Sequence, residues 1–263
     1  MARINRMARI KTWVTTTREN IGSHKVVRMV PADEVAVDAG VKWAAAAVPR
    51  HYVSADEIAA VLRELGKPEA AEVLSGKLPV SKRTRSGELG EVLATQYVAR
   101  ELGYRMIARL RWKDSREMPM RGDDLLGVRM VDDDKLEFLK GEAKSRASLS
   151  TSTLDEAETA LLSEHGLPTP HALMFVAARL REMGETKLHV KILAAQLRGR
   201  IRPGDVLHLL FTLSGNNPLG LLRNHTKAYK GKIRRLGVGL QIPEHQAFIR
   251  RVFEKVIRDA RTR

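Results

Sequence analysis

The chain has 263 residues, with 46 lysines and arginines, 31 aspartates and glutamates, and no cysteine. Its length supports a real hydrophobic core, and a hydrophobic content of 43% with 29% charged residues excludes wholesale disorder. The missing cysteines exclude a disulfide scaffold, a thiolate zinc site and a cysteine nucleophile. The formal net charge of +15 indicates an anionic partner, most often nucleic acid, although a basic surface that maintains solubility would also explain it.

The sequence contains no apolar run that could cross a membrane. The longest runs, 44–48 and 171–178, are far shorter than the ~20 residues that a bilayer-spanning helix needs. No apolar segment follows the basic residues 1–9, so no signal peptide is expected. We therefore expect a soluble, cytoplasmic protein.

The positive charge is concentrated at the two ends of the chain. Residues 1–85 carry a formal charge of +6 and residues 198–263 carry +11, whereas residues 86–197 carry −2. An acidic centre between basic ends suits a protein that holds a cation beside a polyanion, but the same distribution also arises by chance.

The first part of the chain contains one predicted strand and two predicted helices. Residues 25–30 have a strand-like pattern. Ser54 and Glu57 form a capping box in front of a helix whose apolar residues recur at helical spacing. A shorter helix is expected over 69–74, and the polar, basic residues 78–86 are expected to be a linker.

The middle of the chain begins with the clearest helical pattern. An apolar stripe predicts a helix that begins at Ser86 and ends at Gly103. Three strands are predicted after it, over 104–112, 124–131 and 136–144. The three aspartates at 132–134 are expected to form the turn between the last two strands.

The remaining elements complete a mixed pattern. Caps at 150–153 precede a helix that runs to about 165. The apolar run 172–180 is predicted to be a buried strand, 188–197 is helix or strand, and 206–213 is a further strand. An amphipathic helix is expected over 244–261. Helix, three strands, helix and strand in this order predict a mixed α/β fold.

Five charged residues in the middle segment could carry chemistry. Glu142 and Lys144 are two apart on a strand, so their side chains share one face. Pairing of the predicted hairpin brings Asp124 near the strand that carries Glu142. Glu88 and Glu91 lie three apart on one face of a helix, and either could supply a third carboxylate. Oxygen ligands of this kind suit Mg²⁺ or Mn²⁺, whereas the eight histidines show no ligand spacing.

The order of these residues resembles that of a known nuclease superfamily. A helical glutamate, then Arg-Gly-Asp-Asp-Leu at 121–125, then Gly-Glu-Ala-Lys at 141–144, resembles the PD-(D/E)xK nucleases, with Gly-Asp-Asp in place of the usual Pro-Asp. Together with Gly-Glu-Leu-Gly-Glu at 87–91, these segments resemble the HamA family, the nuclease subunit of Hachiman anti-phage defence, over roughly residues 80–200. The resemblance implies a restriction-endonuclease-like core, with a mixed central sheet flanked by helices.

The resemblance also implies a role for each residue of the set. Asp124 and Glu142 would hold Mg²⁺ or Mn²⁺, with Glu91 as a further ligand or a residue behind the ligands. Lys144 would orient the attacking water and neutralise charge on the scissile phosphate of DNA. The family's spacing after glycine favours Asp124 over Asp123.

The resemblance implies an organisation and a partner for the whole chain. Residues 81–200 would form the nuclease core, 1–80 an N-terminal extension of strand and helix, and 201–263 a basic part packed on the core. The implied partner is the superfamily 2 helicase HamB, and a homo-oligomer is left open. No membrane partner is expected.

Basic residues outside this set could hold a nucleic acid backbone. The candidates are Lys82, Arg83, Arg85, Arg146, Lys230, Lys232, Arg234 and Arg235. A solvated linker explains the first three equally well, and a partner-protein surface explains the last four.

Two other functions fit the same fold. A nucleic-acid-binding subunit without catalysis would keep the basic residues, but it would not need the complete acidic and lysine set. A restriction endonuclease paired with a methyltransferase would need an element that reads a target sequence, and none is visible in the chain.

Overall fold

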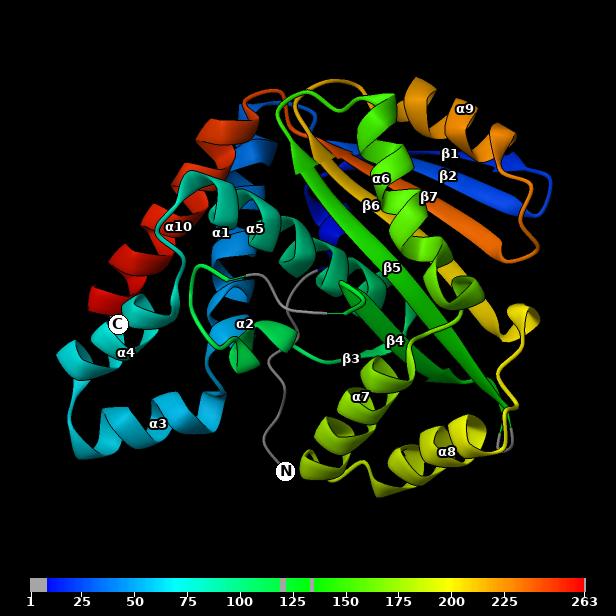
Figure 1. The fold of residues 1–263 in the computed structure, drawn as a ribbon. Helices are drawn as coiled ribbons and strands as arrows, with labels where there is room; N and C mark the ends of the chain where they lie inside the picture. The colour runs from blue at the N-terminus through cyan, green and yellow to red at the C-terminus, as the bar shows by residue number, and fades with distance from the viewer. Residues whose placement is uncertain (1–8, 119–121, 133–134, 263) are drawn as a thin grey trace.

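The computed structural model describes residues 9–118, 122–132 and 135–262. Within them, seven strands form one sheet in the order β1-β2-β7-β6-β5-β4-β3 (Figure 1). The strands are β1 (Thr15–Ile21), β2 (His24–Val30), β3 (Arg105–Met106), β4 (Leu125–Met130), β5 (Leu136–Arg146), β6 (Val206–Ser214) and β7 (Arg234–Gln241). The four central strands β2, β7, β6 and β5 are parallel to one another, and β1, β4 and β3 pair antiparallel to their neighbours at the two edges.

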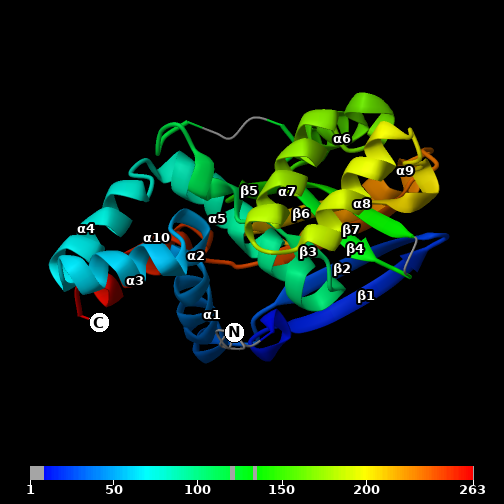
Figure 2. The same cartoon turned by 90° about the horizontal axis from the view of Figure 1, so that it is seen from below.

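Helices cover both faces of this sheet. The helices are α1 (Glu34–Ala47), α2 (Pro49–Tyr52), α3 (Ala55–Glu64), α4 (Lys67–Lys77), α5 (Lys82–Tyr97), α6 (Thr151–Leu162), α7 (Pro170–Glu182), α8 (Thr186–Leu197), α9 (Leu219–Ala228) and α10 (His245–Thr262). Shorter helical turns are η1 (Ile10–Thr12), η2 (Val98–Leu102), η3 (Arg109–Trp112), η4 (Ser163–Gly166) and η5 (Pro203–Asp205). One face packs against α1, α5 and α10, and the other against α6, α7, α8 and α9. The helices α3, α4 and α10 gather at the end of the molecule away from α8 and α9 (Figures 1 and 2).

Strand β5 is the central element for the candidate site. Its side chains alternate between the two faces, so Leu139 and Ala143 join the core under α5 while Phe138 joins the core under α7 and α8. Because helices cover both faces, almost the whole strand is buried. Gly90 allows α5 to approach closely, since a Cβ at this position would lie 3.3 Å from the Cβ of Ser145.

Several predictions made from the sequence are confirmed. The fold is mixed α/β with a mixed central sheet flanked by helices. β4 and β5 form the predicted antiparallel hairpin, with Leu125 opposite Gly141. Ser54 caps α3 by accepting a hydrogen bond from the Glu57 amide, and the strand at 206–213 and the helix at 244–261 are both present.

The prediction of a buried strand over 172–180 is wrong, because this run lies in α7. Thr169 caps the helix by accepting a hydrogen bond from the Ala172 amide, and Pro170 occupies its first turn. The buried residues Leu173, Val176, Ala177 and Leu180 recur at helical spacing. A short apolar run does not distinguish a buried strand from a buried helix. The ambiguous run 188–197 also proves to be helical, as α8.

Two further boundaries differ from prediction. Residues 78–86 are not a linker throughout, because Ser81 accepts a hydrogen bond from the Thr84 amide and α5 begins at Lys82. Over 104–112 only β3 is a strand, and η3 follows it.

The sheet runs across all three predicted segments. β1 and β2 come from 1–80, β3 to β5 from 81–200, and β6 and β7 from 201–263. The boundaries at 80 and 200 fall in connections between helices and the next element. In the described part of the chain, no helix combines the length and apolar composition that a membrane span requires.

Candidate active site

The β4–β5 hairpin brings Asp124, Glu142 and Lys144 together. Asp124 directly precedes β4, and the hairpin register places it beside Glu142 on β5. The main-chain amide of Ala143 donates a hydrogen bond to Oδ2 of Asp124 over 3.2 Å. Lys144 Nζ donates to Oε2 of Glu142, also over 3.2 Å. Two carboxylates and an ammonium therefore share one end of the hairpin, as the sequence predicts.

The carboxyl groups of the cluster are buried close to one another, which opposes their ionisation. Glu142 is 6% exposed, and burial followed by repulsion from Asp124 raises the pKa of its carboxyl group to about 8, against the effect of Lys144. Burial and Asp124 likewise raise the pKa of Glu91 to about 8, against the effect of Arg109. A bound cation would compensate the charges of such neighbouring carboxylates, so the cluster is a candidate cation site.

Asp123 and Asp124 have different surroundings. Asp123 Oδ1 lies 3.5 Å from the ammonium of Lys140, which is fully buried, and its Oδ2 accepts a hydrogen bond from the Thr169 amide. Lys140 Nζ also donates to the main-chain oxygens of Ser163 and Leu167. The carboxylate of Asp123 thus ties β5 to the connection between α6 and α7, and Asp124 is the residue that faces Glu142.

Glu88 and Glu91 differ in the same way. Glu88 accepts hydrogen bonds from the hydroxyl of Tyr52 and from Nζ of Lys113, and both of these partners are nearly buried. Glu91, one helical turn later, is the residue that interacts with Asp124. In the described ranges, Glu91, Asp124 and Glu142 do not bring three oxygens within 4.8 Å of one another, so Glu91 lies at the edge of the cluster. Sequence reasoning missed Tyr52 and Lys113, because only tertiary folding brings them to Glu88.

The basic residues near the cluster divide into exposed and anchored side chains. Arg146 is exposed at the end of β5, two residues beyond Lys144, and Lys82 and Arg83 are exposed in the first turn of α5. Arg85 is anchored instead: its Nε donates to the Pro79 carbonyl and its guanidinium lies 5.1 Å from the ring centre of Phe253.

The predicted basic loop before β7 is smaller than expected. Lys230 and Lys232 are exposed in the connection from α9 to β7. Arg234 begins β7 and pairs with Glu137 at 2.5 Å. The inclusion of Arg235 is wrong, because it is 2% exposed and its guanidinium pairs with Glu158 at 2.6 Å inside the fold.

The fold and the cluster define a mixed α/β protein whose central sheet presents two carboxylates and a lysine from one β-hairpin. The family model described as HamA matches residues 7–256, so the chain belongs to the HamA family. It is 26% identical over 233 residues to the Hachiman protein HamA of Bacillus cereus, a match that covers 86% of this chain and 83% of that protein.

Proposed function

We propose that this protein is a Hachiman defence protein that hydrolyses DNA phosphodiester bonds with a divalent metal ion. The observation that carries the proposal is the convergence of Asp124, Glu142 and Lys144 at one end of the β4–β5 hairpin. Membership of the HamA family and the name of the Bacillus cereus relative support the defence role. The mixed sheet flanked by helices is consistent with the restriction-endonuclease-like core that PD-(D/E)xK enzymes share.

The residues of the cluster fit a hard divalent cation. Asp124 and Glu142 would hold Mg²⁺ or Mn²⁺, because both ions prefer carboxylate oxygens and because burial and then repulsion from Asp124 raise the pKa of Glu142, which a bound cation would offset. Glu91, at the edge of the cluster, would act through water or on a second ion. When bound, such an ion supplies Lewis acidity and a more acidic water at the scissile phosphate.

The other side chains act on the substrate. The ammonium of Lys144, which donates a hydrogen bond to Glu142, would orient the attacking water and offset charge on the phosphate oxygens. Arg146, Lys82 and Arg83 are exposed near the same end of β5 and would contact the DNA backbone. The ion pair between Asp123 and Lys140 would hold the start of β4 against β5, next to the proposed catalytic residues.

The proposal is tested by plasmid degradation in Mg²⁺ and in Mn²⁺. We expect Glu142→Gln and Lys144→Met to reduce the rate at least about 100-fold, since each removes a group that acts on the transition state. Glu72→Gln and Lys77→Met serve as matched controls, because they make the same chemical changes at exposed residues of α4. Both control variants should cleave DNA like the unaltered protein. Equal degradation by all variants would show that the assignment is wrong.

The proposed partner is a superfamily 2 helicase of the HamB type, which would restrain or deliver the nuclease. If the chain alone is inactive, the same variants are assayed after the helicase has been added. If the protein binds DNA but does not hydrolyse it, with or without the helicase and in both Mg²⁺ and Mn²⁺, the result would favour a non-catalytic binding subunit.

A further inference from the structure

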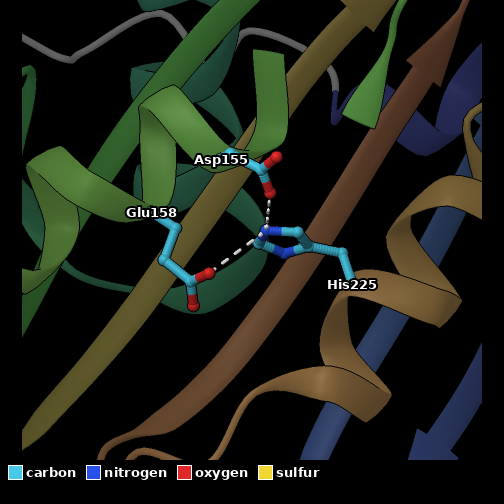
Figure 3. A group of neighbouring side chains, drawn as sticks. All are labelled: Asp155, Glu158 and His225. Atoms are coloured by element: carbon cyan, nitrogen blue, oxygen red, sulfur yellow. Dashed lines mark ion pairs between the residues drawn. The ribbon is translucent and has the colours of Figure 1, made fainter. Parts of the chain in front are cut away.

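A second group of metal-ligand side chains lies on the face of the sheet covered by α6 and α9. Asp155 and Glu158 extend from α6 and His225 extends from α9, and Figure 3 shows the imidazole between the two carboxylates. One donor atom from each residue lies within 4.8 Å of the other two. None of these residues belongs to the cluster at Asp124 and Glu142.

The spacing of the donor atoms matches a coordination sphere. Nε2 of His225 lies 3.4 Å from Oδ1 of Asp155 and 3.3 Å from Oε2 of Glu158. Ligands bound at ~2.0–2.1 Å in a tetrahedral zinc site are separated by roughly 3.3 Å from one another. One cation could therefore contact all three side chains with little movement of the helices.

The imidazole nitrogen at the centre of the group lacks a hydrogen-bond partner. The side chain of His225 is only 6% exposed, and Nε2 has no hydrogen-bond partner among the described residues. Burial lowers the pKa of the His225 imidazole, against the attraction of Glu158. A buried nitrogen without a hydrogen-bond partner needs an explanation, and a cation held by this nitrogen and the two carboxylates would supply one.

Arg235 orients Glu158 from behind. Its guanidinium pairs with Oε1 of Glu158 at 2.6 Å and lies 3.5 Å from the ring centre of Tyr229, which leaves Oε2 facing His225. Ligand carboxylates are commonly held by such secondary contacts. The same guanidinium is 3.4 Å from Nδ1 of His225, beyond the usual hydrogen-bond range of about 2.7–3.2 Å. Coordination of a cation through Nε2 would place the ring hydrogen on Nδ1. Nδ1 could then no longer accept a hydrogen bond from Arg235, whereas the ion pair between Arg235 and Glu158 would be kept.

The group is open to solvent on one side. A cleft of about 640 Å³ is lined by Asp155, Glu158 and His225 together with Tyr229 and Lys230. The side chain of Asp155 is 62% exposed, whereas that of His225 is buried. A cation would enter from the cleft past the exposed carboxylate of Asp155, and water would complete its coordination.

We propose that Asp155, Glu158 and His225 bind a divalent cation of the zinc class, which joins α6 to α9. The imidazole distinguishes this site chemically from the oxygen-only cluster at Asp124 and Glu142, because imidazole favours Zn²⁺ and carboxylates favour Mg²⁺ or Mn²⁺. The cation would fasten α6, which follows the strand carrying Glu142, to its neighbour α9.

The test is a calorimetric titration, in which Zn²⁺ is added to metal-stripped full-length protein at pH 7.5 and the heat of binding is measured. We expect Asp155→Asn and His225→Ala to weaken this binding at least tenfold, and Glu156→Gln, an exposed neighbour on α6, to leave it unchanged. Because Asp155 is largely exposed, its variant should fold even if that of His225 does not. Zn²⁺ should also raise the melting temperature of the unaltered protein but not that of Asp155→Asn.

Glu142→Gln separates this site from the proposed active site. Retention of Zn²⁺ binding by Glu142→Gln supports the α6–α9 site whether or not the protein cleaves DNA. Loss of all Zn²⁺ binding in Glu142→Gln, unaltered binding by Asp155→Asn, or no Zn²⁺ binding by the unaltered protein would each overturn the proposal.

Discussion

The carboxylate of Asp124 is held by the main-chain amide of Ala143, the residue between Glu142 and Lys144. This hydrogen bond of 3.2 Å joins the residue before β4 to the middle of the reactive stretch of β5. The three proposed catalytic side chains are therefore positioned by one hairpin.

The adjacent aspartates should separate function from stability. Asp124→Asn should abolish DNA cleavage and leave the melting temperature nearly unchanged, because it removes a proposed ligand and keeps the side-chain shape. Asp123→Asn should instead lower the free energy of unfolding by about 3 kcal/mol, since it leaves the buried ammonium of Lys140 without its counter-charge. Urea denaturation and plasmid cleavage measure the two effects, and the reverse pattern would exchange the two roles.

The contacts of Glu88 predict a structural role for Tyr52 and Lys113. Tyr52→Phe removes one donor to a buried carboxylate and should lower the free energy of unfolding by about 1–2 kcal/mol. Lys113→Met should lower the free energy of unfolding further than Tyr52→Phe does. Burial raises the pKa of Glu88, and the variant removes the ammonium that compensates the buried carboxylate. Denaturation of both variants checks this order. A larger loss for Tyr52→Phe than for Lys113→Met would contradict it.

His245 should make the stability depend on pH. Its Nε2 lies 2.9 Å from Oγ of Ser145, and burial lowers its pKa to about 4. Between about pH 6.5 and 4 the unfolded chain binds a proton that the folded chain does not, so stability falls as the pH falls through this window. The loss approaches about 3 kcal/mol at its lower end. His245→Gln should reduce the slope of stability against pH, and His171→Gln, at an exposed site, should not.

Two helical glycines should respond oppositely to alanine. A Cβ at Gly40 of α1 would lie 2.6 Å from Cε3 of Trp13, so Gly40→Ala should lower the free energy of unfolding by about 1–3 kcal/mol. Gly87 of α5 has open space around the same position, and Gly87→Ala should raise the free energy of unfolding by about 0.5–1 kcal/mol. Thermal melts of the two variants compare the effects directly. An unchanged or raised free energy of unfolding in Gly40→Ala would mean that helix packing at Trp13 is not tight.

The sequence was sufficient to predict the features that depend on short separations. The β4–β5 hairpin and the shared face of Glu142 and Lys144 follow from strand periodicity and a nearby turn. The order of charged residues also sufficed to suggest the HamA family. The choice between neighbouring acids required tertiary contacts, because Lys140 and Thr169 decide the surroundings of Asp123.

Other features depend on contacts between distant segments. His225 meets Asp155 and Glu158 only because α9 packs beside α6, so no spacing of histidines indicates the group. β1 was not predicted because it is an edge strand with little buried surface. The apolar run in α7 fits a strand as well as a helix by its composition alone, and the helix is started by the Thr169 cap and Pro170 in the first turn.

The parallel centre of the sheet also sets an order of events during synthesis. Lys25 of β2 pairs with Leu236 of β7, and Phe138 of β5 pairs with Val206 of β6. β7 lies between β2 and β6, so the sheet can close only after the ribosome has passed Gln241. Until then the nascent chain carries open edges on β2 and on the largely buried β6, and such non-local pairing slows folding. The sheet that supports the charged hairpin is therefore closed only after β7 has been made.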